Sequence, residues 1–434
     1  MEIVWLFYFP LAFMIFITIF KYKKPKLPEF EITEAVQQSK NGRKRKANRA
    51  LNPKRRKIFG VKSNCGTAST DLKTADKIFL IFQITSKGSN AKVVKRSIKS
   101  ILDSCKGILK NYRIDVVVEP EASISGNANV VIIPKKFKTE NGTLHKARAN
   151  HYALFLRREK GENTPYYWIY HMDEESVLTK QCLFGLLEFI IKSKKTGKLI
   201  GQGEIIYPHY FGKNLLTSLC DGMRPAWCLG MCRRFMNGKY PLMFHGSHII
   251  IRADIEDKVQ WDFGTASLTE DILFCHKAYK IFGAIFGWCN GILEEQSPFS
   301  IKDFFKQRRR WFVGICQCVK SPLLPIKSKI FLTYCLFTWT TGLLAFIVAI
   351  IDIIFPTPIP LWIQIPALFE MFVLFTLYQI GLIRNIQPLN LIKIRKIKYH
   401  ILAFILTPLL GLLEILTAMY ALIFMSKDYD VIKK

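Results

Sequence analysis

Acidic residues are scarce in this 434-residue chain, where 33 Asp and Glu face 63 Lys and Arg and give a formal net charge of +30. A nucleic-acid-binding surface would interleave such cations on a folded face. Here the dense basic clusters lie beside long apolar runs, as they do on the cytosolic side of membrane spans. They occupy residues 21–26, 43–56 and 384–398. The sequence therefore favours a membrane protein, and we expect no nucleic-acid partner.

A regular cysteine framework is also missing. The eleven cysteines are scattered and odd in number, so reduced thiols facing the cytosol fit better than a disulfide-stapled secreted domain. Cys228 and Cys232, with His245 and His248 nearby, are residue types that bind zinc, but the usual spacing of paired zinc ligands is absent. Buried structural thiols are the favoured interpretation.

Positive charge is absent before the first apolar run, residues 3–20, which Glu2 precedes and several lysines follow. A cleaved signal peptide has the opposite order. We therefore predict an uncleaved anchor over residues 1–20, with the chain after it in the cytosol. The basic residues 21–76 are interpreted as a tether attracted to anionic lipid, although they also resemble a nuclear-import signal.

Half of the residues are hydrophobic and 13% are aromatic. This composition is too apolar for a disordered chain, and its hydrophobic and aromatic content is high for a soluble enzyme. It therefore indicates membrane segments joined to a folded core. Residues 77–296 alternate between strand-like and helix-like segments, which predicts an α/β domain with a mostly parallel sheet. Ligands of such sheets bind at the carboxyl ends of strands, and Thr85, Glu119 and Asp173 fall at those ends.

The rest of the chain is apolar and basic. Residues 297–329 predict an amphipathic helix in the cytosolic membrane interface. Residues 330–355, 361–383 and 400–425 are each long enough to span the bilayer, within a membrane region of 330–425 followed by a tail, 426–434. Glu370 and Glu414 lie inside these spans, where carboxylates serve a proton pathway or are buried against a partner.

Three motifs carry the chemistry, and they occur in order along the chain. An apolar run ends in Asp173-Glu174-Glu175, a second motif reads Thr269-Glu270-Asp271, and a third reads Gln-x-x-Arg-Trp at residues 307–311. An acidic pair at a strand end can hold a divalent metal ion, and a later carboxylate can act as a base. Helix capping is an equally ordinary role for Asp271. Together the three motifs suit sugar transfer from a nucleotide diphosphate donor.

The order of these motifs resembles the inverting, membrane-embedded glycosyltransferases of family 2, which include cellulose and hyaluronan synthases. Within that family, the sequences of the motifs are similar to those of the egghead-type β-1,4-mannosyltransferases of animals. The resemblance covers roughly residues 77–330. It also rests on the segments 82–88, 146–149, 201–203 and 297–299.

The resemblance implies a GT-A-like catalytic domain with about four transmembrane helices, and it implies roles for individual residues. Asp173 and Glu175 would hold Mg²⁺ or Mn²⁺, although the family's usual second carboxylate is Asp. Asp271 would be the catalytic base, with Glu270 supporting it. The implied donor-binding residues are Thr85, Glu119, Lys146, Arg148, Gln307, Arg310 and Trp311. The implied acceptor-binding residues are Gly246, Ser247, His248 and Trp311.

The function implied by the resemblance is transfer of mannose from GDP-mannose to a membrane glycolipid, glucosylceramide, in glycosphingolipid synthesis. The enzyme would be a multi-pass protein of the endoplasmic reticulum or Golgi, with its catalytic domain in the cytosol and membrane lipids as partners. Two alternatives stay open: a processive polysaccharide synthase that uses a UDP-sugar, and a membrane scaffold without catalytic activity. Spacing alone selects neither the sugar nor the acceptor.

Overall fold

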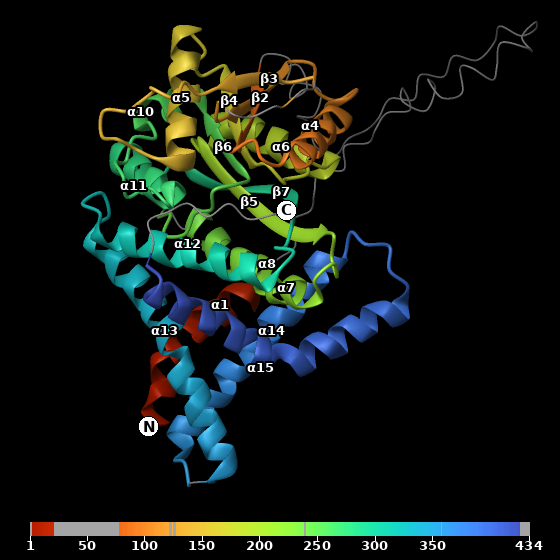
Figure 1. Ribbon diagram of the computed structural model, residues 1–434, viewed down its shortest axis with the longest axis vertical. Coiled ribbons are helices and arrows are strands. Elements are labelled where there is room, and N and C mark those ends of the chain that lie inside the picture. Colours follow the sequence, from red (N-terminus) through yellow and green to blue (C-terminus); the bar gives the residue numbers. More distant parts are fainter. Residues whose placement is uncertain are drawn as a thin grey trace, which may run out of the picture.

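The computed structural model describes residues 2–20, 78–120, 124, 127–237, 240–356 and 358–425. The predicted tether at residues 21–76 and the predicted tail at residues 426–434 lie outside the described residues. Figure 1 shows a domain built on a β-sheet at one end, long helices at the other, and helix α12 between them.

A seven-stranded sheet in the order β3-β2-β1-β4-β6-β5-β7 forms the centre of the domain. Strands β1 to β4 pair in parallel, as do β5 and β7, while β6 runs antiparallel to both of its neighbours. This topology confirms the predicted α/β class with a mostly parallel sheet. The strands are β1 (Phe79–Ser86), β2 (Tyr112–Val118), β3 (Asn129–Ile132), β4 (Tyr167–Asp173), β5 (Ile200–His209), β6 (Ile249–Arg252) and β7 (Phe286–Gln296).

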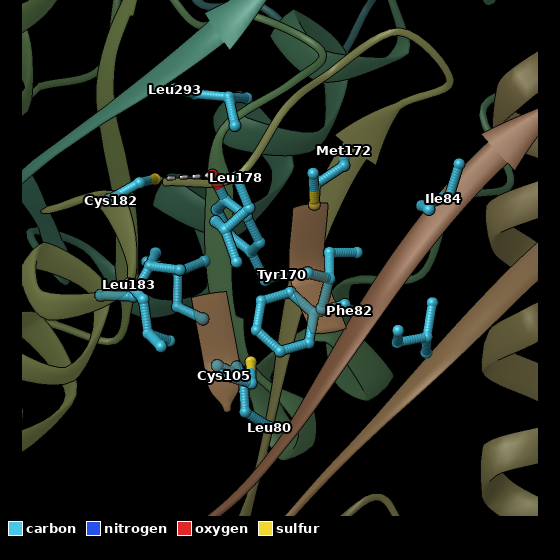
Figure 2. Close-up of a cluster of buried hydrophobic side chains, with 14 of the residues drawn as sticks. Leu80, Phe82, Ile84, Cys105, Tyr170, Met172, Leu178, Cys182, Leu183 and Leu293 are labelled. Atoms are coloured by element: carbon cyan, nitrogen blue, oxygen red, sulfur yellow. Dashed lines mark hydrogen bonds between the residues drawn. The ribbon is translucent and has the colours of Figure 1, made fainter. Parts of the chain in front are cut away.

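Helices cover both faces of the sheet because successive strand residues point to opposite sides. On one face, alternate residues of β1 such as Leu80 and Phe82 are buried against α4 (Ala91–Cys105) and α6 (Lys180–Thr196). Figure 2 shows this core around Tyr170. The other face is covered by α5 (His145–Glu159), α10 (Ala253–Val259) and α11 (Glu270–Phe282).

The parallel strands end together at one edge of the sheet. Thr85 is level with Asp173 on β4, and Ser86 is level with Val118 on β2. The backbone after β2 continues into Glu119, so the strand ends named by the sequence share one edge. That edge is where a ligand of this topology would bind.

Short helices between β5 and β6 connect the sheet to the membrane helices. They are α7 (Leu215–Cys220), α8 (Met223–Trp227), the π-helical turn η2 (Cys228–Cys232) and α9 (Arg233–Asn237). Ala226 and Met231 from this group pack with residues of α1 and α14. At Gly381 the α14 backbone approaches Gly222 so closely that an added Cβ would overlap the Gly222 carbonyl. Glycine is therefore required where α14 crosses this group.

Three helices are long and apolar enough to cross a membrane: α13 (Ile326–Ile354), α14 (Leu361–Ile386) and α15 (Lys393–Ile423). They match the three predicted spans within a few residues at most ends, although α15 begins seven residues before its predicted span. The predicted N-terminal anchor forms a 3₁₀ turn, η1 (Glu2–Phe7), followed by the 12-residue α1 (Phe9–Phe20). A span of α-helix needs about 20 residues, so the fourth span stays a prediction.

Helix α12 (Ile301–Lys320) joins the sheet domain to these helices. It begins where the Ser300 side chain accepts a hydrogen bond from the Asp303 N–H at 3.1 Å. Arg308 on this helix is buried and pairs with Asp221 at 2.7 Å and with Glu414 of α15 at 2.8 Å. The structure therefore identifies Arg308 as the partner of Glu414, one of the two carboxylates inside the predicted spans.

Candidate active site

The site is built around the end of β4, where Asp173 meets the start of α5. The Lys146 ammonium group donates hydrogen bonds to the Asp173 carboxylate and, at 2.5 Å, to the Gly246 carbonyl. The side chain of Asp173 is 35% exposed. One cation thus links the acidic strand end to the loop before β6 and leaves part of the carboxylate accessible.

The second acidic motif reaches the same place through the start of α11. A methyl group added to Gly246 would lie 3.2 Å from Lys146 Nζ, 3.5 Å from Glu270 Oε1 and 3.6 Å from Asp271 Oδ2. Lys146 Nζ is 3.9 Å from Glu270 Oε1. The structure therefore brings together Asp173, Lys146, Gly246, Glu270 and Asp271, which lie far apart in the sequence.

The two carboxylates of α11 differ in exposure, since Glu270 is buried and Asp271 keeps partial access to solvent. Loss of water raises the pKa of Glu270 to about 8, with Lys146 opposing the rise and Asp271 adding to it. Loss of water also raises the pKa of Asp271 to about 6, although the Ile272 N–H and Lys146 oppose that rise. Burial thus favours the neutral form of both carboxyl groups, and Asp271, the more exposed of the two, is the one placed to exchange a proton with a ligand.

The donor set suits a hard divalent cation. Negative charge is crowded here. Burial raises the pKa of Glu295, and the nearby Asp173 charge raises it further. Carboxylate oxygens are the ligands that Mg²⁺ and Mn²⁺ prefer. Glu175 is buried, and its backbone carbonyl accepts a hydrogen bond from Arg96 at 2.9 Å. A bound ion would therefore meet the exposed Asp173 oxygens first.

A pocket of about 570 Å³ lies beside this centre, at the end of β2 and the start of α5. Arg148 lines it and donates to the Glu119 carboxylate at 3.0 Å, so these two predicted donor residues form an ion pair. The pocket is lined by Glu119, Pro120, Lys135, Phe137, Lys138, Gly142, Thr143, Leu144, His145 and Arg148. Its basic side chains and the positive end of α5 favour an anionic ligand.

The Thr85 side chain is directed into a buried polar network. Its hydroxyl donates to the Asn150 side chain at 3.0 Å, and Gln83 donates to the same oxygen at 2.9 Å. Arg157 donates to Gln83 and also pairs with buried Glu256 at 2.6 Å. Thr85 is thus the outermost member of a buried polar network that holds the end of β1.

The predicted acceptor residues 246–248 separate into different roles. Gly246 faces the carboxylates, while the Ser247 hydroxyl accepts a hydrogen bond from the Asp173 N–H at 3.3 Å. His248 is fully buried, with Nε2 2.9 Å from the Gly291 carbonyl and Nδ1 2.8 Å from the Tyr170 hydroxyl. A carbonyl only accepts, so Nε2 carries the proton and Nδ1 accepts from the phenol. The structure does not bring His248 to the site.

Gly203, from the predicted 201–203 segment, lies directly over this histidine. A Cβ at Gly203 would fall 2.2 Å from His248 Nε2. Burial lowers the pKa of His248 to about 3, which keeps the ring neutral. The glycine of this motif is therefore explained by packing against a buried imidazole.

The Gln-x-x-Arg-Trp motif occupies one face of α12. Gln307 is buried and accepts from Arg308, while Arg310 and Trp311 are partly exposed. Two guanidinium groups contact the Trp311 ring, with Arg224 4.7 Å and Arg308 4.5 Å from the ring centroid. Such cation–π contacts fix the ring, which leaves Trp311 as a rigid aromatic surface beside the helix.

Comparison with known proteins adds the family. Residues 168–425, more than half of the chain, match the family model described as glycosyl transferase family group 2. The chain belongs to this family. The matched segment contains all three motifs and the membrane helices. With the sheet topology described above, it confirms a membrane-anchored GT-A-like glycosyltransferase.

The family members most informative for this chain are named β-1,4-mannosyltransferases. The fly (Drosophila melanogaster) protein egh is 29% identical over 313 residues, covering 71% of this chain and 67% of its own length. The worm (Caenorhabditis elegans) protein bre-3 is 33% identical over 288 residues, covering 64% and 62%. The chain thus spans about two thirds of the length of these relatives. The resemblance to egghead-type enzymes is confirmed, and so is the prediction of a glycosyltransferase.

Two further charged residues, Glu295 and Arg224, lie at this site and were not predicted from the sequence. Glu295 is buried and accepts from the Ser176 hydroxyl at 3.0 Å. An acidic pair at the end of an apolar run, residues 294–295, was the signal for it. Arg224 stacks on Trp311 and on Tyr207, and its charge acts on Glu295. Nothing in its local sequence distinguishes Arg224 from other surface arginines.

Proposed function

We propose that this enzyme transfers mannose from GDP-mannose to glucosylceramide with inversion, forming a β-1,4 linkage. The observation that carries the proposal is the meeting of Asp271 with Lys146 and Asp173 around Gly246. The names of the relatives supply the sugar and the linkage. Donor, acceptor and metal are therefore the parts that an experiment must test.

Asp271 is the proposed base. Its ionised carboxylate would take the proton of an acceptor hydroxyl while that oxygen attacks the anomeric carbon. The bond between the anomeric carbon and the phosphate oxygen breaks on the opposite face, and the nucleoside diphosphate leaves with the bonding electrons. Positioned base catalysis contributes roughly 10²–10⁴-fold. Partial exposure of Asp271 suits this role, and burial of Glu270 suits support of the helix start.

The remaining residues would bind the diphosphate and the nucleoside. Asp173 and Glu175 would hold Mg²⁺ or Mn²⁺, which offsets the charge of the diphosphate when bound. Lys146 would add a second positive charge to the same group. Arg148 would also face the diphosphate, and Glu119, which lines the same pocket, would contact the nucleoside. Thr85 would reach it only after releasing Asn150.

Helix α12 would cover the donor and acceptor from the membrane side. Arg310 would bind the diphosphate, Trp311 would stack on the acceptor sugar, and buried Gln307 would hold their helix in place. The loop at Gly246 and Ser247, which lies beside Asp271, would contact the acceptor. A lipid acceptor fits, because α12 connects the sheet domain directly to the apolar helices. Basic residues at the ends of those helices support a cytosolic catalytic domain, and residence in the endoplasmic reticulum or Golgi is part of the proposal.

The test is a sugar-transfer assay on full-length protein in detergent with Mn²⁺ and glucosylceramide, offering GDP-mannose, UDP-glucose and UDP-N-acetylglucosamine in parallel. Transfer of mannose alone, abolished by a chelator and restored by Mn²⁺ or Mg²⁺, is the expected result. Asp271→Asn is the matched inactive control. A polymer made from a UDP-sugar would move the function to the synthases. No transfer by folded protein would favour the scaffold.

A further inference from the structure

Two thiols and an imidazole converge behind the acceptor loop. Cys228 and Cys232 stand at the two ends of the π-helical turn η2, and His245 comes from the segment just before β6. Their ligand atoms all lie within 4.8 Å of one another. The Cys228 sulfur is 3.1 Å from His245 Nε2. The π-helical turn and the loop before β6 thus meet at sulfur and nitrogen atoms.

The imidazole is oriented with its lone pair toward the sulfurs. His245 Nδ1 is 3.3 Å from the Ser247 carbonyl, which can only accept, so Nδ1 carries the proton. The lone pair is then on Nε2, which lies 3.1 Å from the Cys228 sulfur and accepts a hydrogen bond from the Gln202 amide nitrogen at 2.7 Å, so that a bound metal ion would replace this hydrogen bond. Gln202 is itself held, since its oxygen accepts from the His245 backbone N–H at 3.1 Å. A ring nitrogen fixed through a carbonyl in this way is typical of metal-ligating histidines.

The surroundings of these thiols differ from those of the other cysteines. In the described part of the chain, the buried residues Cys105, Cys182, Cys220, Cys275, Cys289 and Cys318 each belong to a hydrophobic cluster. Cys228 and Cys232 are also buried but belong to none of these clusters. Packing explains the first group. It does not explain why two thiols face a histidine.

We propose that Cys228, Cys232 and His245 bind a zinc ion, with water at the fourth tetrahedral position. Zinc binds cysteine sulfur at about 2.3 Å and histidine nitrogen at about 2.0–2.1 Å, so tetrahedral sulfur and nitrogen ligands lie roughly 3.5 Å apart. The present Cys228–His245 separation reaches that value with a shift of a few tenths of an ångström. The site is distinct from the hard-cation site at Asp173, which has oxygen ligands.

The zinc site would position the acceptor loop. His245 precedes Gly246, whose α-carbon faces Asp271, and η2 packs on the N-terminal helix through residues such as Met231. The ion would therefore fix the loop to the membrane-facing part of the molecule. This positioning role rests on the proposed function, whereas zinc binding itself does not.

The test is the zinc content of full-length protein purified in detergent without chelator, measured by elemental analysis. About one zinc per chain is expected. Cys228→Ser and Cys232→Ser should each lower it at least tenfold. The matched control is Cys289→Ser, a buried thiol in a hydrophobic cluster, which should keep its zinc. His245→Cys should restore binding that His245→Ala loses, because it supplies a third thiolate.

Several outcomes would overturn the proposal. One is zinc-free protein that also fails to take up added Zn²⁺ at micromolar concentration. Another is equal zinc in the wild type and Cys232→Ser. A third is a mass two daltons low from a Cys228–Cys232 disulfide in zinc-free protein. The wild-type measurement stands even if a variant misfolds. Because no sugar substrate is present, failure of the transfer assay and failure of zinc binding are separate results.

Discussion

Glu270 and Asp271 are adjacent carboxylates that differ in their surroundings. Glu270 is buried beside Lys146, and Asp271 reaches the space around Gly246. The sequence alone made capping and catalysis equal for Asp271. The residues around Asp271 could not be predicted, because Lys146, Asp173 and Gly246 come from three other parts of the chain. At this scale, chemistry is predicted by residue type and decided by contacts.

The pH dependence of transfer should report Asp271. Since a base must be ionised and the pKa of Asp271 is raised to about 6, kcat/KM should fall about tenfold per pH unit below that value. Asp271→Asn should reduce transfer by roughly 10²–10⁴-fold while donor binding persists. Rate measurements between pH 5 and 8 and calorimetric titration with GDP-mannose check both parts. A folded Asn variant with full activity would remove Asp271 as the base.

Glu256 should control acid stability. Burial opposes its ionisation, but Arg157 and His171 together with the Trp261 N–H lower the pKa of Glu256 to about 2. A lowered pKa stabilises the fold above the ordinary value of 4.5 and loses that contribution as pH falls toward about 2. The contribution is about 3 kcal/mol. Thermal unfolding from pH 6 to 3 should therefore be steeper for the wild type than for Glu256→Gln. Identical slopes would contradict this account.

Most elements of the sheet domain were predictable because their apolar residues recur with strand or helix spacing. The alternation predicted for residues 77–296 is present in strands β1 to β4 and helices α4, α5, α6 and α11. Strand β7 does not follow such a pattern, since its sequence contains Gly, Asn and two Glu and resembles a loop. The antiparallel direction of β6 was also beyond local sequence, because pairing with β4 and β5 decides it. Tertiary contacts override local pattern at both strands.

Helices α11 and α12 meet at a glycine, and that contact should be sensitive to one methyl group. A Cβ at Gly314 would lie 2.4 Å from Thr269 Cγ2, at the start of the acidic motif. Gly314→Ala should therefore separate the helices and destabilise the fold by roughly 1–3 kcal/mol, with reduced transfer. Gly411→Ala is the matched control, since its nearest contact is an ordinary 3.7 Å. Equal melting temperatures for the two variants would contradict the prediction.

Across the whole molecule, buried charges join the catalytic and membrane parts. Arg308 binds both Asp221 and Glu414, and Arg384 of α14 binds Glu204 of β5 at 2.5–2.6 Å. The sequence indicated the spans and the Gln-x-x-Arg-Trp helix separately. It did not indicate that a carboxylate inside a span pairs with the residue after Gln307. Such pairing depends on how the two parts dock, which no local pattern records.

Glu414→Gln should weaken that docking. Removing one partner of a buried ion pair costs roughly 3–5 kcal/mol when the remaining charge is left without compensation, and we expect a smaller loss here because Asp221 still pairs with Arg308. We expect a lower melting temperature in detergent and weaker quenching of Trp fluorescence, since Arg308 also contacts the Trp311 ring. Lys192→Ala is the control, because it removes an exposed surface pair. A Gln variant as stable as this control would show that the pairing contributes little.

The contact between β5 and α14 also constrains the order of synthesis. Glu204 is synthesised 180 residues before its partner Arg384. The Tyr207 N–H likewise donates a hydrogen bond of 2.8 Å to the side chain of Asn385, which is synthesised later. Contacts of such long sequence separation form late. The sheet can therefore pair during translation, but the contacts of β5 with α14 form only after the second of the three C-terminal helices has been synthesised and has docked. Docking of this predicted span is then a step in maturation of the enzyme itself.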